Sequence, residues 1–148
     1  HKEYRRQRQM CIRDRMNTVR DLHAAACQAF ERAYAPYSGF KVGAAVLDDC
    51  GHISRGCNVE NVSYPCGTCA EAGAIAAMIA GGGKKIREIL IVADSRELIK
   101  PCGACLQRIA EFAAPETPVH LADSQNVRQT FKLSDLLPQA FNAEELSE

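Results

Sequence analysis

Two C-x-x-C pairs constrain the fold of this chain more than any other feature. They stand in the segments C-G-T-C-A-E (66 to 71) and P-C-G-A-C (101 to 105). Cysteines at this spacing are typical of zinc sites. A zinc site closed by four protein ligands is structural, whereas a site with three protein ligands keeps a position for water. The fold must therefore bring two segments that are separate in sequence beside one ion.

The position of Glu71 favours the open, catalytic kind of site. Cys102 and Cys105 at a helix start place both sulfurs on one side, and Cys69 from a neighbouring helix adds a third corner of a tetrahedron. Glu71 can then take a proton from a metal-activated water and return it to a leaving group. Cys66 lies in a P-C-G turn whose direction the sequence does not fix. A structural four-cysteine zinc-binding module is therefore the alternative of another class.

Composition and charge limit the kinds of partner. The chain has 148 residues, enough for one core, and its 18 basic and 18 acidic residues give a net charge of zero. This balance favours a small neutral substrate over nucleic acid or anionic lipid. No apolar run reaches the roughly 20 residues of a membrane span. The C-x-x-C spacing favours a metal site in the reducing cytoplasm over secreted disulfides.

Residues 1–15 differ from the rest of the chain. This segment is basic and poor in apolar residues, and patterned sequence begins at Met16. We interpret residues 1–15 as a non-native or disordered leader and residues 16–148 as a single domain. The alternative is a basic targeting or nucleic-acid-binding arm.

Hydrophobic periodicity and turn signals predict an α/β domain with helices packed on a mixed sheet. We expect helices over 17–34, 69–80 and from 102 or 103 to 112, and a helical turn over 134–138 that Ser134 caps. We expect strands over 40–47, 52–59, 88–93 and 118–122, the first two joined by a turn at 48–51. None of His23, His52 and His120 lies at ligand spacing from a cysteine, so we expect structural or exposed roles for them.

Five segments, in the same order, resemble the cytidine deaminase family in its small homotetrameric, zinc-dependent form. They are Y-A-P-Y-S-G-F-K-V-G-A-A (34 to 45), G-C-N-V-E-N (56 to 61), T-C-A-E (68 to 71), P-C-G-A-C (101 to 105) and L-L-P-Q-A-F (136 to 141). The resemblance implies a three-layer α-β-α fold with a mixed five-stranded sheet. It also implies a cytoplasmic hydrolase of pyrimidine salvage that converts cytidine or deoxycytidine to uridine or deoxyuridine and ammonia.

The resemblance implies a role for each matching residue. Cys69, Cys102 and Cys105 would be the zinc thiolates, and Glu71 the proton shuttle. The substrate-binding positions would be Phe40 as pocket wall, Asn58 and Glu60 at the ribose hydroxyls, the backbone of Ala70 at the base, and Tyr64 and Phe141 at subunit boundaries. Phe141 would enter a neighbouring subunit's pocket, which requires an oligomer, expected to be a homotetramer. Taken alone, Phe40 also fits a core strand, and the Asn58 and Glu60 pair fits a solvated strand edge.

The chain departs from the family pattern beside the zinc cysteines. Ala72 and Leu106 stand where family members have arginines that offset the negative charge of three thiolates on a divalent ion. Helix dipoles and Arg108, one turn further on, are candidate substitutes. The small Ala72 and Gly73 are also compatible with a wider pocket. An alternative function is therefore deamination of an N-substituted cytosine nucleoside or a blasticidin S-like compound.

Overall fold

The computed structural model describes residues 2–147, although not the side chains of residues 10–17. The larger helices are α1 (Lys2–Arg32), α2 (Ala70–Ala80) and α3 (Gly103–Phe112). The strands are β1 (Gly43–Asp48), β2 (Ile53–Cys57), β3 (Ile86–Val92), β4 (Pro118–Ala122) and β5 (Val127–Lys132). The short α4 (Leu133–Leu136) and two 3-10 turns, η1 (Tyr64–Cys66) and η2 (Ala143–Leu146), complete the described elements.

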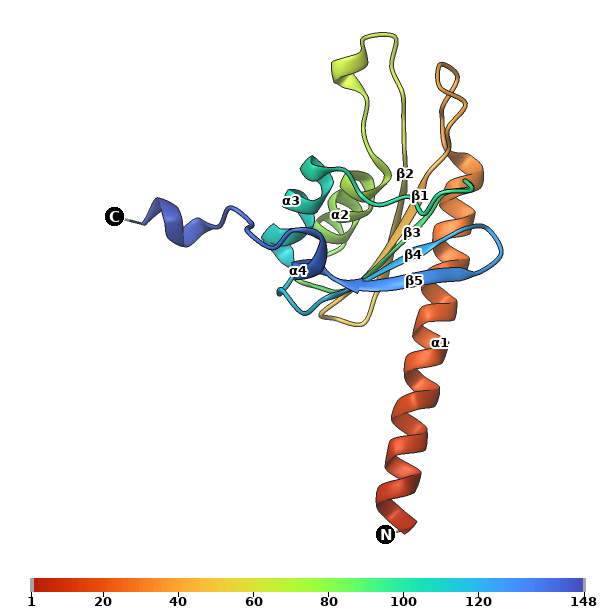
Figure 1. Ribbon diagram of the computed structural model, residues 1–148, viewed down its shortest axis with the longest axis vertical. Coiled ribbons are helices and arrows are strands. Elements are labelled where there is room, and N and C mark those ends of the chain that lie inside the picture. Colours follow the sequence, from red (N-terminus) through yellow and green to blue (C-terminus); the bar gives the residue numbers. More distant parts are fainter. Residues whose placement is uncertain (1, 148) are drawn as a thin grey trace.

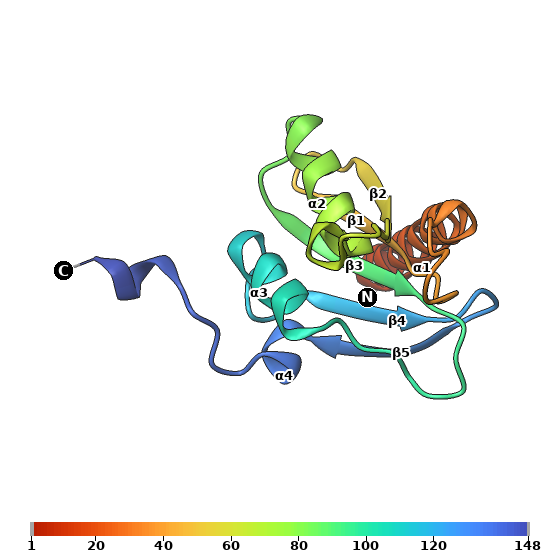
Figure 2. The ribbon, with the colours of Figure 1, turned by 90° about the horizontal axis from the view of Figure 1, so that it is seen from above.

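The strands form one mixed sheet in the order β2-β1-β3-β4-β5. β3 and β4 are parallel, and the other neighbouring pairs are antiparallel. α1 covers one face of the sheet, and α2 and α3 lie on the other (Figures 1 and 2). The predicted three-layer α-β-α fold with a mixed five-stranded sheet is confirmed.

β3 is buried on both faces because it lies at the centre of the three layers. Ile89 and Ile91 belong to the apolar cluster under α2 and α3. Leu90 and Val92 point to the opposite face, in the cluster that includes Leu22 of α1. The alternation of side chains along a strand thus gives each helical layer its own core.

α1 begins at Lys2, well before the predicted start at residue 17. Residues 2–9 are all exposed. The interpretation of residues 1–15 as a leader remains a prediction. In this segment, the side chains of residues 10–15 lie outside the described part of the chain. No described helix combines the length and hydrophobicity that a membrane span requires.

The last strand and the helix after it differ from the expected elements. The sequence analysis expects a fifth strand but gives no range for it. In β5, only Val127 and Phe131 are apolar and most side chains are exposed, so its sequence carries little strand signal. α4 begins after Lys132, whose backbone N–H donates to the Asp135 carboxylate at 3.0 Å. The predicted cap at Ser134 is therefore wrong, because Ser134 lies inside the helix.

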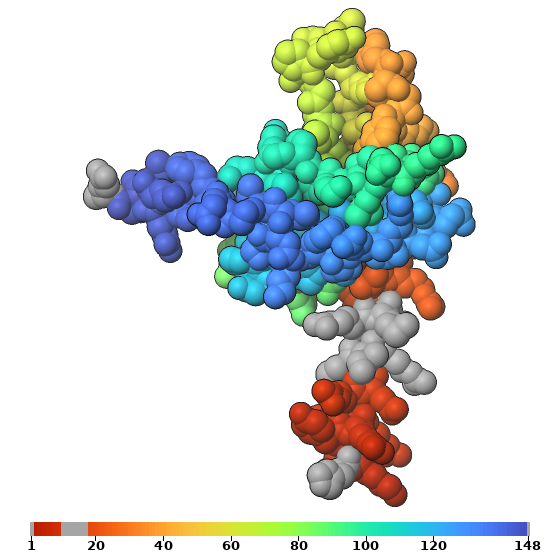
Figure 3. Space-filling view, in the orientation of Figure 1, coloured from red at the N-terminus to blue at the C-terminus, as the bar shows by residue number. Residues whose placement is uncertain are grey.

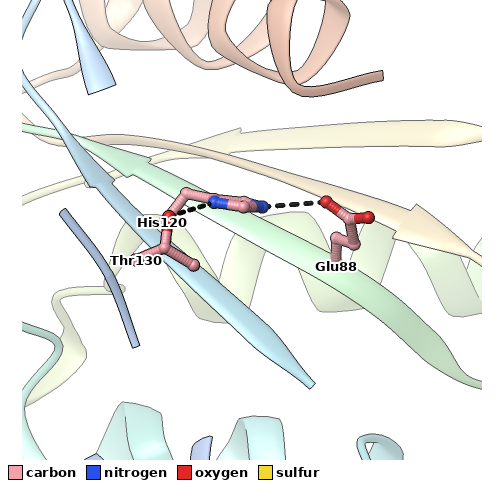
Figure 4. Close-up of polar contacts among 3 residues, drawn as sticks. All are labelled: Glu88, His120 and Thr130. Carbon is pink, nitrogen blue, oxygen red and sulfur yellow. Dashed lines mark hydrogen bonds and ion pairs between the residues drawn. The ribbon is translucent and has the colours of Figure 1, made fainter. Parts of the chain in front are cut away.

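A buried histidine joins three strands of the sheet (Figure 4). The Nδ1 atom of His120 on β4 lies 2.7 Å from the hydroxyl of Thr130 on β5, and its Nε2 atom lies 2.8 Å from a carboxylate oxygen of Glu88 on β3. Both ring nitrogens have partners, as a buried imidazole requires. The structural role expected for His120 is confirmed.

A close approach of backbones fixes α2 on β2. A Cβ atom added at Gly56 of β2 would lie 2.2 Å from the backbone nitrogen of Ala74 and 2.5 Å from the carbonyl oxygen of Ala70. Both neighbours are backbone atoms, so neither can move aside by changing a rotamer. Only glycine at position 56 lets α2, which carries Glu71, lie this close to the sheet.

We expect Gly56→Ala to lower the unfolding free energy by about 2 kcal/mol, the cost of overpacking a dense contact. For a domain of this size that corresponds to a fall of about 4–8 °C in melting temperature. The control is Gly103→Ala, where an added Cβ meets nothing within 4 Å. Thermal unfolding at one fixed protein concentration compares the variants. Equal melting temperatures for the two variants would contradict the close approach.

Candidate metal centre and active site

Three cysteines from the starts of two helices form the centre of the site. Cys69 is the N-cap of α2, Cys102 is the N-cap of α3, and Cys105 lies in the first turn of α3. Their Sγ atoms all lie within 4.8 Å of one another. α2 and α3 pack side by side on the same face of the sheet (Figures 1 and 2). Their packing brings together two cysteine motifs that are separate in sequence.

The three sulfurs fit a zinc ion in chemistry and spacing. A tetrahedral ion with zinc–sulfur bonds of about 2.3 Å needs sulfurs about 3.8 Å apart, so small shifts suffice. Backbone hydrogen bonding from the N–H of Cys105 lowers the pKa of Cys102, the direction that favours a thiolate. Burial raises the pKa of Cys69 and Cys105, so these two thiols need a cation nearby to ionise.

Cys66 lies outside this cluster. It is exposed at the end of η1, and its thiol donates to the hydroxyl of Ser63 at 3.5 Å. Among the described residues, Cys69, Cys102 and Cys105 form one group of possible metal ligands and Asp48, Asp49 and Cys50 form another; neither contains Cys66. A closed four-cysteine zinc module therefore finds no support in the arrangement of the thiols.

Glu71 places a buried carboxylate beside the sulfurs. It lies in the first turn of α2 with only 5% of its surface exposed, and its Oε2 atom accepts a hydrogen bond from the Cys105 thiol at 3.5 Å. Burial raises the pKa of Glu71, and the charge of Arg108 opposes this rise. A carboxyl group with a raised pKa can both accept and donate a proton near neutral pH, as a general acid–base requires.

A cavity of about 220 Å³ opens onto the cysteines and Glu71. Besides these four residues, it brings together three predicted substrate contacts, Phe40, Asn58 and Ala70. Its remaining walls are Val42, Ile91, Ile99 and Lys100, which the sequence analysis missed. Val42 lies within the quoted segment 34 to 45 but, like Ile91, carries only an ordinary strand pattern, and Ile99 and Lys100 lie in a loop outside the quoted motifs. The small volume suits a single planar ring rather than a large ligand.

Asn58 holds one wall of this cavity in place. Its Oδ1 atom accepts from the backbone N–H of Val42, and its Nδ2 atom donates to the carbonyl of Phe40, both at 2.8 Å. The side chain therefore fixes the backbone on either side of residue 41. One lone pair of Oδ1 and one hydrogen of Nδ2 remain for another partner.

Glu60 and Tyr64 line a second cavity of about 400 Å³ rather than the cysteine cavity. The carboxylate of Glu60 accepts from the hydroxyl of Ser38 at 2.5 Å and from the backbone N–H groups of Ser38 and Tyr37. These hydrogen bonds lower the pKa of Glu60, and the bond from the Ser38 hydroxyl contributes most. The Tyr64 ring is exposed and meets Tyr37 edge-on at 6.3 Å. Figure 3 shows segments 33–42 and 58–69 projecting together from the body.

Phe141 lies away from both cavities within one chain. It is 56% exposed, and its carbonyl accepts from the side chain of Gln107 at 2.7 Å. It contributes to a surface groove of about 540 Å³ between α3, α4 and the C-terminal segment, which projects from the body (Figure 1). The single chain thus does not bring Phe141 to the cysteine cavity.

The residues that replace the family's arginines have different surroundings. Leu106 packs in the core under α2 and α3. Neither Ala72 nor Gly73 contributes to the described lining of the cysteine cavity, and Gly73 faces β2 instead. The idea that these two small residues widen the pocket stays a prediction, which the present lining does not support. Arg108 donates from Nη1 to the Cys105 sulfur at 4.0 Å, which places a positive charge beside the cluster.

Comparisons with known proteins agree with this geometry. The family model described as the cytidine and deoxycytidylate deaminase zinc-binding region matches residues 16–121. A cytidine deaminase of Halalkalibacterium halodurans is 43% identical over 123 residues, which cover 83% of this chain and 93% of the relative. One of Sporosarcina psychrophila is 41% identical over 129 residues, covering 87% and 95% of the two chains.

A crystal structure of the cytidine deaminase of Burkholderia pseudomallei superposes with a TM-score of 0.77 at 42% identity, covering 82% of this chain and 98% of that one. Similarity of both sequence and fold therefore extends over most of the domain. The site geometry, the family model and these relatives together show that the chain belongs to the zinc-dependent cytidine deaminase family.

Proposed function

We propose that this chain hydrolyses cytidine and deoxycytidine to uridine and deoxyuridine with release of ammonia, using zinc held by Cys69, Cys102 and Cys105. The observation that carries the proposal is the buried carboxyl group of Glu71 beside three clustered sulfurs at a ring-sized cavity. The zinc ion supplies Lewis acidity that lowers the pKa of the attacking water. Every other contribution comes from side chains and backbone of the protein.

Glu71 moves the protons of the reaction. Its carboxylate takes one proton from the attacking water and delivers it to the cytosine ring nitrogen. It then takes the second proton from the new hydroxyl group on ring carbon 4 and delivers it to the departing amine. A carbon–oxygen bond forms at ring carbon 4, and the carbon–nitrogen bond to the amine then breaks. Burial raises the pKa of Glu71, so its carboxyl group is suited to hold a proton between uptake and delivery.

The substrate contacts follow from the same cavity. Phe40 forms a wall against the base, and the backbone of Ala70 contacts the base edge, since both residues line the cavity. Asn58 lies at the same cavity with one donor and one acceptor free for a ribose hydroxyl. Glu60, which Ser38 holds in the second cavity, is proposed to bind a second ribose hydroxyl.

We propose that the active form is a homotetramer whose neighbouring subunits complete each site. Tyr64 and Phe141 are 78% and 56% exposed, and an exposed aromatic side chain is typical of an interface. Phe141 reaches a nucleoside only from another subunit, because within its own chain it lies outside the cysteine cavity. The proposed setting is cytoplasmic pyrimidine salvage, consistent with the seven described cysteines all being free thiols.

We also propose that Arg108 offsets the charge of the thiolates. Three thiolates on a divalent cation leave one net negative charge, and the guanidinium of Arg108 lies 4.0 Å from the Cys105 sulfur. The positive ends of α2 and α3 add to this effect. Arg108 would then take the place of the arginines that Ala72 and Leu106 replace.

Replacing Glu71 tests the catalytic assignment. We expect Glu71→Gln to lower kcat for cytidine by about 10²–10⁴-fold, the usual contribution of a general acid–base, while the zinc content is unchanged. Uridine formation and ammonia release measure the rate. Glu116→Gln, at an exposed position, is the matched control and should keep wild-type activity. Near-normal turnover by Glu71→Gln would exclude the proposed proton shuttle.

Two cysteine variants distinguish a zinc ligand from a cysteine outside the cluster. Cys105→Ser should lose most of its zinc during gel filtration against a chelator, because a buried hydroxyl is a much poorer zinc ligand than a thiolate. Cys66→Ser should retain about one zinc per chain, since its sulfur lies outside the cluster. Elemental analysis of the purified proteins gives both values. Zinc loss from Cys66→Ser would restore the closed four-cysteine site.

Arg108→Gln should weaken zinc binding by about 10–100-fold, as is typical when a partner of a metal ligand is removed. Competition with a chromophoric chelator measures the affinity in the absence of substrate. Arg87→Gln, at an exposed position near the start of β3, removes the same charge away from the cysteines and should leave the affinity unchanged. Equal affinities for the two variants would show that Arg108 does not compensate the thiolates.

A further inference from the structure

The loop between β3 and α3, residues 93–102, builds one side of the cysteine cavity. It supplies Ile99 and Lys100 to the wall and ends at Cys102. Figure 2 shows this loop leaving the end of β3, passing beside β5 and returning to α3. The position of these three residues therefore depends on how a long connection without regular structure is held.

One side chain binds three consecutive carbonyl groups of this loop. The Nη1 atom of Arg128 on β5 donates to the backbone oxygen of Ser95 at 3.0 Å and to that of Glu97 at 3.3 Å. Its Nη2 atom donates to the backbone oxygen of Arg96 at 3.0 Å. The planar fork of an arginine can donate in several fixed directions at once, which a lysine ammonium on its flexible stem does not reproduce. Arg128 thus defines the path of the backbone over 95–97.

Other contacts hold the loop at different points. At its start, the backbone N–H of Ala93 donates to Ala122, and Asp94 accepts from the N–H of Ser124 at 2.8 Å. Further along, the Leu98 side chain packs against the core under α2 and α3. Within the described chain, the hydrogen bonds that tie residues 95–98 to elements outside the loop all come from Arg128.

We propose that Arg128 is a positioning residue of the deaminase, a role that rests on the function proposed above. Its three hydrogen bonds go to residues that do not line the cavity. It holds the loop two residues before Ile99, and through the loop it sets where Ile99, Lys100 and Cys102 stand. Because Arg128 is an exposed residue, we expect water to replace its hydrogen bonds when the side chain is removed, with loop motion rather than loss of the fold as the main consequence.

Arg128→Met tests this role, because methionine keeps an apolar stem and removes every donor. We expect kcat/KM for cytidine to fall by about 5-fold to 100-fold, the range that small displacements of catalytic groups produce. Trypsin should also cleave faster after Arg96 of the zinc-loaded protein, since cleavage reports local opening. The next basic residue, Lys100, precedes Pro101 and resists trypsin, so the fragment from Arg96 is diagnostic. Mass spectrometry identifies it.

Two further variants make the result specific. Arg87→Met removes an exposed arginine from β3 and should match the wild type in activity and in cleavage after Arg96. Arg128→Lys keeps the charge without the planar fork and should lose part of the activity, with intermediate cleavage. It also serves as the test if Arg128→Met does not fold, which circular dichroism shows.

Both readouts must change together. Faster cleavage after Arg96 with unchanged kcat/KM would show that Arg128 anchors the loop without positioning the site, and it would overturn the proposal. A fall in kcat/KM without faster cleavage would overturn it as well, because the effect would then bypass the loop. A zinc-loaded wild-type protein that does not deaminate cytidine would refute the proposed function instead, and the cleavage assay would still report on the loop.

Discussion

The N-termini of α2 and α3 meet on the same face of the sheet, and the whole site is built at this meeting point. Each helix start brings its own part of the chemistry: Cys69 and Glu71 from α2, and Cys102 and Cys105 from α3. The close backbone contact at Gly56 fixes α2 on β2. The parallel pairing of β3 and β4 requires a crossover, and α3 is the helix of that crossover. The site is thus a consequence of the topology.

This arrangement also sets the electrostatics of the centre. Four groups that become negative when ionised share a small region, and burial raises the pKa of Glu71, Cys69 and Cys105. Such a cluster is costly in the absence of positive charge. A divalent cation, two helix N-termini and the Arg108 guanidinium supply it. The same burial that makes the thiols require a metal keeps Glu71 suited to holding a proton.

The sequence predicted the elements whose patterns are strong and local. The antiparallel hairpin of β1 and β2, the helix after Cys69 and the doubly buried β3 are present close to the expected positions. The sequence did not predict β5, because it is an edge strand with mostly polar, exposed side chains. Its backbone is held as a strand by pairing with β4. Within the site, spacing identified the cysteines and Glu71, whereas Ile99, Lys100 and the Arg128 contacts depend on the path of a loop that carries no periodic signal.

We propose that three sulfurs hold the zinc ion and leave its fourth position for water. X-ray absorption at the zinc edge tests it most directly, because it counts the sulfur and oxygen neighbours of the metal in the holoenzyme. We expect three sulfurs at about 2.3 Å and one oxygen at about 2.0 Å. A shell of four sulfurs would contradict it, since no position would remain for the attacking water beside Glu71.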